Sequence, residues 1–119
     1  MRFEDQRLLL VNELKREGII SPAVLDAIGK VPRENFVLQE YLDYAYQNRP
    51  LPIKEGQTIS QPLMIAIMLQ LLDLQPTDIV LEIGTGSGYQ SALLAEIVQE
   101  VCTVERLETL SLNAQKVLR

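Results

Sequence analysis

The stretch LEIGTGSGYQ, residues 81–90, constrains the fold more than any other part of the sequence. An apolar, β-rich run (DIVLEIG, 78–84) leads into it, a helix-like segment (SGYQSALLAEIVQE, 87–100) follows, and a second β-rich run (EVCTVE, 100–105) comes next. A strand, a helix and a strand in this order form the unit of a doubly wound parallel sheet with a right-handed crossover. The sequence therefore predicts an α/β fold with a ligand site beside the glycine-rich loop, at the carboxyl ends of the strands.

The spacing of the glycines and the acids around them indicate the kind of ligand. Gly84, Gly86 and Gly88 follow the pattern G-x-G-x-G, whereas the dinucleotide fingerprint is G-x-G-x-x-G. Glu82 precedes the loop, and Glu105 lies 21 residues beyond Gly84, where a ribose-binding carboxylate belongs. Two acids would repel a pyrophosphate, but they suit a ligand that carries a ribose, an ammonium and a sulfonium. S-adenosyl-L-methionine carries all three.

A plainer interpretation of the loop stays open at this point. A glycine-rich turn between a strand and a helix is often only a turn. Glu105 can be a surface acid, and Glu82 can be a partner of the helix dipole. If the loop does bind S-adenosyl-L-methionine, we expect the carboxylate of that ligand to use the N–H groups where the helix after Gly88 begins.

Hydrophobic periodicity predicts helices in the rest of the chain. Ser21 is expected to cap the second helix, with Pro22 in its first position. The stretch between residues 31 and 57 is expected to be an ordered loop with one short helix. The predicted helices span residues 3–17, 21–29, 40–45, 62–74 and 106 onward.

Apolar residues also predict how these elements pack. The helix at 62–74 is apolar on more than one face, which predicts burial against a sheet. The strand at 78–84 is expected to be buried on both faces, and Cys102, in the second strand, to be a small buried hydrophobe. The helix between the strands should turn Leu93, Leu94, Ile97 and Val98 inward.

Two strands make a poor sheet, and parallel strands need cover on both faces. We therefore expect that the 119 residues are a piece of a longer design, or that something else completes the sheet.

Composition excludes several classes of function. The chain has 16 acidic and 11 basic residues, which gives a net charge of -5 and argues against wide contact with nucleic acid. It has no histidine and one cysteine, so a Cys/His zinc site, a histidine base and an internal disulfide are excluded, and no metal is expected. The longest apolar run, 63–69, is too short to span a bilayer, and the first ten residues are not a signal peptide. The prediction is a cytoplasmic protein without a membrane partner.

Four segments resemble the protein-L-isoaspartate O-methyltransferase family. They are VPRENFV (31–37), AYQNRPLPI (45–53), GQTISQP (56–62) and VLEIGTGSGYQSALLAEIV (80–98). The resemblance runs from about residue 31 to residue 119. The glycine loop alone marks a large methyltransferase superfamily, and GQTISQP is much more specific. Lys54 and Glu55 depart from the family, which often has glycine and a polar residue there.

The resemblance implies a fold and an activity. It implies N-terminal helices followed by the start of a doubly wound, Rossmann-like sheet of an S-adenosyl-L-methionine-dependent methyltransferase. Residues 1–60 would form a helical and loop segment that contributes to the active site, and residues 61–119 the first β-α-β portion of the cofactor-binding domain. The enzyme would methylate the free α-carboxylate of L-isoaspartyl residues in damaged proteins, acting as a monomer.

The resemblance also implies the residues of the site. Ser60 matches the active-site serine, whose hydroxyl would bind the substrate carboxylate and would not act as a nucleophile. Ser60 has a structural alternative, because it stands just before the helix at 62–74 and can be its N-cap. The residues implied to bind the cofactor are Gln57, Thr58, Glu82, Gly84, Thr85, Gly86, Ser87, Gly88 and Glu105.

Two other functions remain open from the sequence. The chain can be a related methyltransferase that acts on a small molecule or a nucleic acid, although GQTISQP and the acidic charge favour a protein substrate. It can also be a truncated, non-catalytic fragment that binds cofactor only with a partner.

Overall fold

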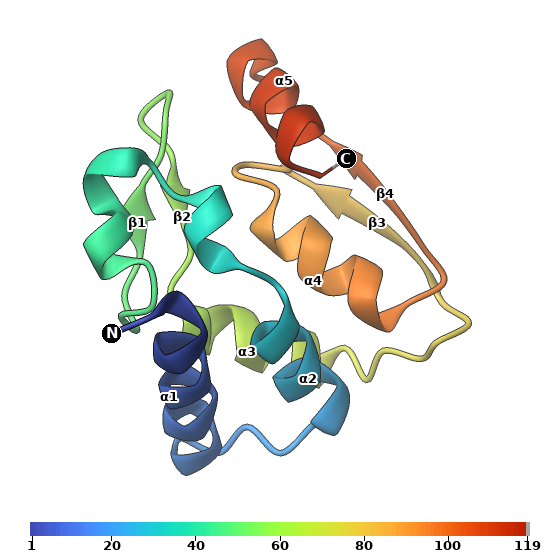
Figure 1. The fold of residues 1–119 in the computed structure, drawn as a ribbon. Coiled ribbons are helices and arrows are strands. Elements are labelled where there is room, and N and C mark those ends of the chain that lie inside the picture. Colours follow the sequence, from blue (N-terminus) through green and yellow to red (C-terminus); the bar gives the residue numbers. More distant parts are fainter. Residues whose placement is uncertain (119) are drawn as a thin grey trace.

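The computed structural model describes residues 1–118, and one side of it is formed by a pair of parallel strands joined by a helix (Figure 1). Strand β3 (Ile79–Ile83) and strand β4 (Glu100–Val104) pair in register from Ile79 opposite Glu100 to Ile83 opposite Val104. Helix α4 (Tyr89–Ile97) connects them. The predicted β-α-β unit is confirmed, within a residue or two at each boundary.

The two-stranded sheet is covered on one face only. The predicted inward residues Leu93, Leu94, Ile97 and Val98 of α4 and its C-cap are all buried. Side chains alternate between the faces of a strand, so the other face carries Ile79, Leu81 and Ile83, which are 66%, 63% and 76% exposed. The prediction that this strand is buried on both faces is therefore wrong for the described chain.

Cys102 lies on the same open face of the sheet. It pairs with Leu81 across the two strands, and it is exposed. The prediction of a buried Cys102 is wrong for the same reason, since nothing among residues 1–118 covers that face.

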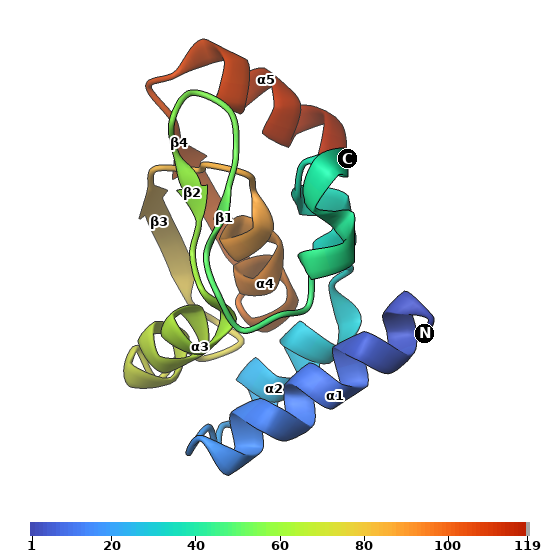
Figure 2. The same ribbon diagram turned by 90° about the vertical axis from the view of Figure 1, so that its left-hand side faces the viewer.

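The two N-terminal helices form a hairpin that packs against the β-α-β unit (Figures 1 and 2). Helix α1 (Phe3–Arg16) packs on α2 (Pro22–Lys30), and α2 packs in turn on α4. The Oγ atom of Ser21 accepts a hydrogen bond from the Val24 N–H at 3.4 Å, so the predicted cap is confirmed. Their inner faces, with Leu10, Leu14 and Ile28, form one core with α4.

The segment between residues 31 and 57 is more structured than predicted. The short helix expected at 40–45 is a 3-10 helix, η2 (Gln39–Tyr44), and a second one, η1 (Arg33–Phe36), precedes it. Strand β1 (Leu51–Pro52) pairs antiparallel with β2 (Thr58–Ile59), and the hairpin turns at Glu55 and Gly56, which both have positive φ. Strands of two residues leave too short an alternation to be detected in a sequence.

Helix α3 (Pro62–Leu71) is shorter and more exposed than predicted. It ends before Asp73, whose φ of 49° breaks the helical path. One face packs on α2 and the core, while Met64, Met68 and Leu71 are exposed, so full burial against a sheet is wrong.

The N-terminus of α3 is not capped by Ser60. The N-cap is Gln61, whose side chain makes no capping bond, and the Leu63 N–H donates to Oδ1 of Asn48 at 2.9 Å. Asn48 also accepts from the Gln61 side chain through its main-chain carbonyl at 3.1 Å. The structural alternative for Ser60 is therefore wrong, because a residue distant in sequence does the capping.

Helix α5 (Glu108–Val117) closes the described chain and turns Leu110 and Ala114 toward the rest of the molecule. Within residues 1–118, no helix is both long enough and apolar enough to cross a membrane.

We expect the Asn48→Ala substitution to lower the free energy of unfolding by about 1 kcal/mol, because it leaves the Leu63 N–H without its side-chain acceptor. Asn48→Asp keeps an acceptor in place and should preserve most of the stability. Chemical denaturation of the three proteins measures the difference. Ser60→Ala is the matched control, since its hydroxyl caps nothing, and a loss from Ser60→Ala as large as that from Asn48→Ala would contradict this assignment.

Candidate functional site

The glycine loop turns sharply between β3 and α4. Gly84, Gly86 and Gly88 have φ values of 90°, 56° and 92°, a region that other residues rarely adopt. The Gly84 N–H donates to the Val104 carbonyl at 2.8 Å, so the loop begins as an extension of the sheet. A Cβ atom at Gly88 would lie 3.3 Å from Cδ1 of Leu118, which shows how closely the end of α5 approaches the loop.

Glu105, the residue after β4, accepts a hydrogen bond from this loop. Its Oε1 atom accepts the Gly86 N–H at 2.9 Å, and its Oε2 atom accepts the Leu107 N–H at 3.0 Å. The hydrogen bond from Gly86 and, to a smaller extent, that from Leu107 hold the pKa of the Glu105 carboxyl below its ordinary value of 4.5. Each carboxylate oxygen can accept more than one hydrogen bond, so Glu105 keeps capacity for a ligand hydroxyl.

Glu82 is a buried acid held by hydroxyl groups. Its Oε1 atom accepts hydrogen bonds from Ser91 Oγ and, at 2.7 Å, from Thr103 Oγ1. Thr85 extends this chain of hydroxyls through a contact of 2.6 Å with Thr103. The other carboxylate oxygen, Oε2, is buried and has no hydrogen-bond partner among residues 1–118. Burying a carboxylate without a cationic partner is costly, so the site favours a positively charged ligand.

Two adjoining cavities meet at the loop. The larger, of about 520 Å³, lies between the hairpin and the ends of β3 and β4, and its lining includes Gln57, Thr58 and Glu105. The smaller, of about 210 Å³, includes Ser60, Glu82 and the start of α4. Thr58, Gly84 and Gly86 line both.

The cavities bring together nearly all of the predicted site residues. Gln57, Thr58, Ser60, Glu82, Gly84, Thr85, Gly86, Ser87 and Glu105 line one or both. Gly88 lines neither, because it is buried under α5. Its missing side chain gives α5 room to approach the loop, and its predicted contact with a cofactor stays a prediction.

Sequence reasoning missed several lining residues of the larger cavity. Ile83 and Val104 end the two strands, and position at a strand end was the signal that could have found them. Arg106 and Leu107 directly follow Glu105, and Leu110 reaches the cavity from the first turn of α5.

Several N–H groups of the loop and of the start of α4 are engaged within the chain. The Gly88 N–H donates to the Thr85 carbonyl at 2.9 Å, and the Tyr89 N–H donates to Ser87 Oγ at 3.2 Å. The Gly86 N–H is held by Glu105. Of the first N–H groups of α4, the Tyr89 N–H is thus engaged, and binding of a cofactor carboxylate at the start of this helix stays a prediction.

Ser60 lies at the wall of the smaller cavity, and its side chain is exposed. Its main-chain carbonyl accepts a hydrogen bond from Nη2 of Arg33 at 3.2 Å. Across residues 1–118, no cluster of acidic and cysteine side chains could hold a metal ion.

Comparison with known proteins identifies the family. Residues 5–119 match the family model described as protein-L-isoaspartate(D-aspartate) O-methyltransferase. Curated proteins named protein-L-isoaspartate O-methyltransferase from Petrotoga mobilis and Dictyoglomus turgidum are 57% and 56% identical, over 97% of this chain in each case. The chain spans about half the length of these relatives, 54% and 52%.

Solved structures show the same likeness. A protein-L-isoaspartate O-methyltransferase superposes with a TM-score of 0.85 and 31% identity, over 94% of this chain and 38% of that one. The crystal structure of a Plasmodium falciparum relative, in complex with S-adenosyl-L-homocysteine, superposes with a TM-score of 0.81 and 26% identity. The match covers 99% of this chain and 55% of that one. The predicted fold class is confirmed: N-terminal helices lead into the start of a Rossmann-like methyltransferase sheet.

We expect the Glu105→Gln substitution to abolish an acid titration at the glycine loop. Because the pKa of Glu105 is lowered in the folded chain, its carboxylate stabilises the fold above pH 4.5, and this contribution is lost as the pH falls through the lowered pKa. The amide shift of Gly86, measured by NMR, should therefore move with a midpoint below 4.5 in the parent and stay constant in the variant.

The matched control is Glu100→Gln, at the opposite end of β4. It should leave the Gly86 titration unchanged. A Gly86 signal that titrates equally with and without the Glu105 carboxylate would contradict the bond between them.

Proposed function

This chain belongs to the protein-L-isoaspartate(D-aspartate) O-methyltransferase family, and from that premise we propose that it methylates the free α-carboxylate of L-isoaspartyl residues in damaged proteins. The observation that carries the proposal is the meeting of two cavities at Thr58, Gly84 and Gly86. A methyl donor with its ribose in the larger cavity, beside Glu105, and its methionine half in the smaller one, beside Glu82, would lie next to an acceptor at Ser60. Methyl transfer requires such contact, because donor and acceptor must align within one site.

The cofactor that we propose is S-adenosyl-L-methionine, and the chemistry of the cavities supports it. Glu105, already fixed at the loop, would accept the ribose hydroxyls. The unpartnered oxygen of Glu82 would accept the ammonium group, which would compensate a buried negative charge. Gln57 and Thr58 would line the edge of the cofactor, and the glycine loop with Thr85 and Ser87 would hold its methionine half. The relative from Plasmodium falciparum, crystallised with S-adenosyl-L-homocysteine, supports this class of ligand.

The proposed reaction needs alignment more than acid or base catalysis. When bound, S-adenosyl-L-methionine supplies a methyl group activated by its sulfonium. A carboxylate is already a nucleophile at neutral pH, so the absence of histidine from the chain is no obstacle. The residues around the cavities would exclude water from the substrate carboxylate and hold its oxygen in line with the methyl carbon. In the resulting ester, a neighbouring main-chain amide nitrogen would attack the ester carbonyl and expel methanol to close a succinimide, which water can reopen to normal aspartate.

Ser60 is the residue that we assign to the substrate. Its hydroxyl is free of a capping role and would donate a hydrogen bond to the substrate carboxylate. Activation of Ser60 as a nucleophile would need a neighbouring base, and the chain carries no histidine to serve as one.

We propose that the two parts of the chain have the roles that the sequence predicts. Residues 1–60 would contribute the substrate side through Ser60 and the edge of the cofactor through Gln57 and Thr58. Residues 61–119 would contribute the first β-α-β portion of the cofactor-binding domain. We also propose a cytoplasmic monomer that acts on proteins and not on nucleic acid, in keeping with the net charge of -5.

The direct test is transfer of a labelled methyl group to an isoaspartyl peptide. We expect a base-labile methyl ester on that peptide and none on the matched aspartyl peptide. Because the chain spans about half the length of its relatives, the assay includes the chain alone and the chain extended with the C-terminal part of the Petrotoga mobilis relative.

Two outcomes would favour the other functions. Transfer to DNA or to a small molecule, with none to the isoaspartyl peptide, would favour a methyltransferase with another acceptor. A cooperative melt without calorimetric binding of S-adenosyl-L-homocysteine, in both forms, would favour a non-catalytic fragment.

We expect Ser60→Ala to lower turnover by roughly 10- to 100-fold, which corresponds to the loss of one hydrogen bond to a charged group. Cofactor affinity should change little, because the hydrogen bonds that hold Glu82 and Glu105, the two acids assigned to the cofactor, do not involve Ser60. Turnover is measured with the isoaspartyl peptide and affinity by calorimetry. Ser111→Ala on α5 is the control and should change neither, while equal losses of turnover and affinity in Ser60→Ala would contradict the assigned role.

A further inference from the structure

We propose that Arg33 is a positioning residue for methyl transfer. Its buried guanidinium holds the main chain of Ser60 against the first residue of α4, and so fixes the two walls of the smaller cavity relative to each other. The catalytic part of this inference rests on the proposed function, whereas the structural part does not.

Arg33 is completely buried, and its donors are used on main-chain carbonyls. Nε donates to the Ala45 carbonyl at 2.7 Å, and Nη2 donates to the Ser60 carbonyl at 3.2 Å. The main-chain N–H of Arg33 donates to the hydroxyl of Tyr46 at 3.0 Å. One side chain therefore links η1 to the segment after η2 and to the turn that carries Ser60.

The same guanidinium lies over the ring of Tyr89. The distance from Cζ of Arg33 to the ring centroid is 4.9 Å, which is within the range of a cation–π contact. Tyr89 is the first residue of α4, directly after the glycine loop, and it is buried. Ser60 and Tyr89 both line the smaller cavity, so Arg33 contacts both of its walls.

Packing alone does not explain a charged residue at this position. Burial lowers the pKa of the Arg33 guanidinium, and its Nη1 atom has no hydrogen-bond partner among residues 1–118. An apolar side chain of similar length would fill the same space without the cost of removing a charge from water. What only the guanidinium provides is the pair of directed bonds to Ala45 and Ser60, together with the stacking on Tyr89.

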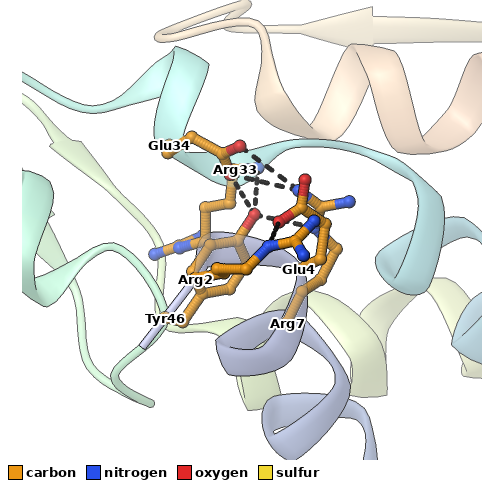
Figure 3. A network of polar contacts seen from close by, with 6 residues as sticks. All are labelled: Arg2, Glu4, Arg7, Arg33, Glu34 and Tyr46. Carbon is orange, nitrogen blue, oxygen red and sulfur yellow. Dashed lines mark hydrogen bonds and ion pairs between the residues drawn. The ribbon is translucent and has the colours of Figure 1, made fainter.

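A second layer of contacts holds Arg33 in place (Figure 3). The Tyr46 hydroxyl, which binds the Arg33 N–H, also donates to Glu34 and accepts from Nε of Arg7 at 2.8 Å. Arg7 and Glu34 form an ion pair at 3.2 Å, and both side chains are largely buried. Burial and the bond to Glu34 raise the pKa of Tyr46 to about 12, so its hydroxyl stays protonated at neutral pH. Through this network α1 supports the position of Arg33.

The test compares Arg33→Met and Arg33→Lys with the control Arg49→Met. Arg49 also lies over a tyrosine ring, at 4.8 Å from the centroid of Tyr44, but it is exposed and lines neither cavity. Two quantities are measured: amide hydrogen exchange of residues 57–63, and kcat and KM for methylation of an isoaspartyl peptide.

We expect faster exchange of residues 57–63 in Arg33→Met and a fall in kcat of about 30- to 100-fold, since small misplacements of reacting groups cost rates of this order. The KM for the cofactor should change by less than about threefold, because the Arg33 side chain bonds to Ala45 and Ser60 and not to Glu82 or Glu105, the acids assigned to the cofactor. Arg33→Lys should recover part of the lost kcat, since an ammonium can reach one of the two carbonyls. Arg49→Met should match the parent in both measurements.

The inference is overturned if Arg33→Met folds and keeps both the kcat and the exchange of the parent. If Arg33→Met does not melt cooperatively, Arg33→Lys decides, and parental kcat and exchange in that variant overturn the inference. If the parent methylates no isoaspartyl peptide, the proposed function fails and the catalytic part of the inference fails with it. Exchange of residues 57–63 then decides the structural part alone.

Discussion

The hydrogen bond from the Gly86 N–H to the Glu105 carboxylate is the contact on which the candidate site depends. It joins the loop that follows β3 to the residue that follows β4, so the carboxyl ends of both strands are fixed at one edge. The positive φ values of the loop make this possible, because they turn its N–H groups back toward the sheet. Without that turn, the two cavities would lose the wall that they share at Gly84 and Gly86.

One face of the β3–β4 sheet is apolar, and residues 1–118 leave it exposed. Ile79, Leu81 and Ile83 form an apolar row on the open face of β3, and α3 adds the exposed Met64 and Leu71 elsewhere on the surface. Parallel strands normally have both faces buried. The apolar pattern in this sequence therefore matches a larger assembly of strands and helices than the described residues form, in line with the half-length match to the relatives.

Local patterns were enough to predict the β-α-β unit and the flanking helices, whereas the full set of predicted site residues came from the resemblance to the family. Periodicity sets helices and strands within a few residues, and the cap at Ser21 is a contact between near neighbours. The errors all involve distant residues. The side chain that caps α3 comes from Asn48, the hairpin at 51–59 brings Thr58 to the glycine loop, and the open face exposes Cys102. Arg33 stands in VPRENFV, but no sequence pattern indicates that it would reach Ser60.

The smaller cavity has a buried charge of each sign around it, and the chain does not pair them. Within residues 1–118 neither Glu82 nor Arg33 belongs to an ion pair, and each has one buried polar atom without a partner. Glu82 is held by hydroxyls and Arg33 by main-chain carbonyls, so both side chains are fixed without being neutralised. A direct pair would be cheaper to bury, but it would leave no net charge to recognise a ligand. Under the proposed function, keeping the two apart would let Glu82 attract a cation while Arg33 holds the main chain of Ser60. Ligand recognition and substrate alignment would then depend on different side chains of one small site.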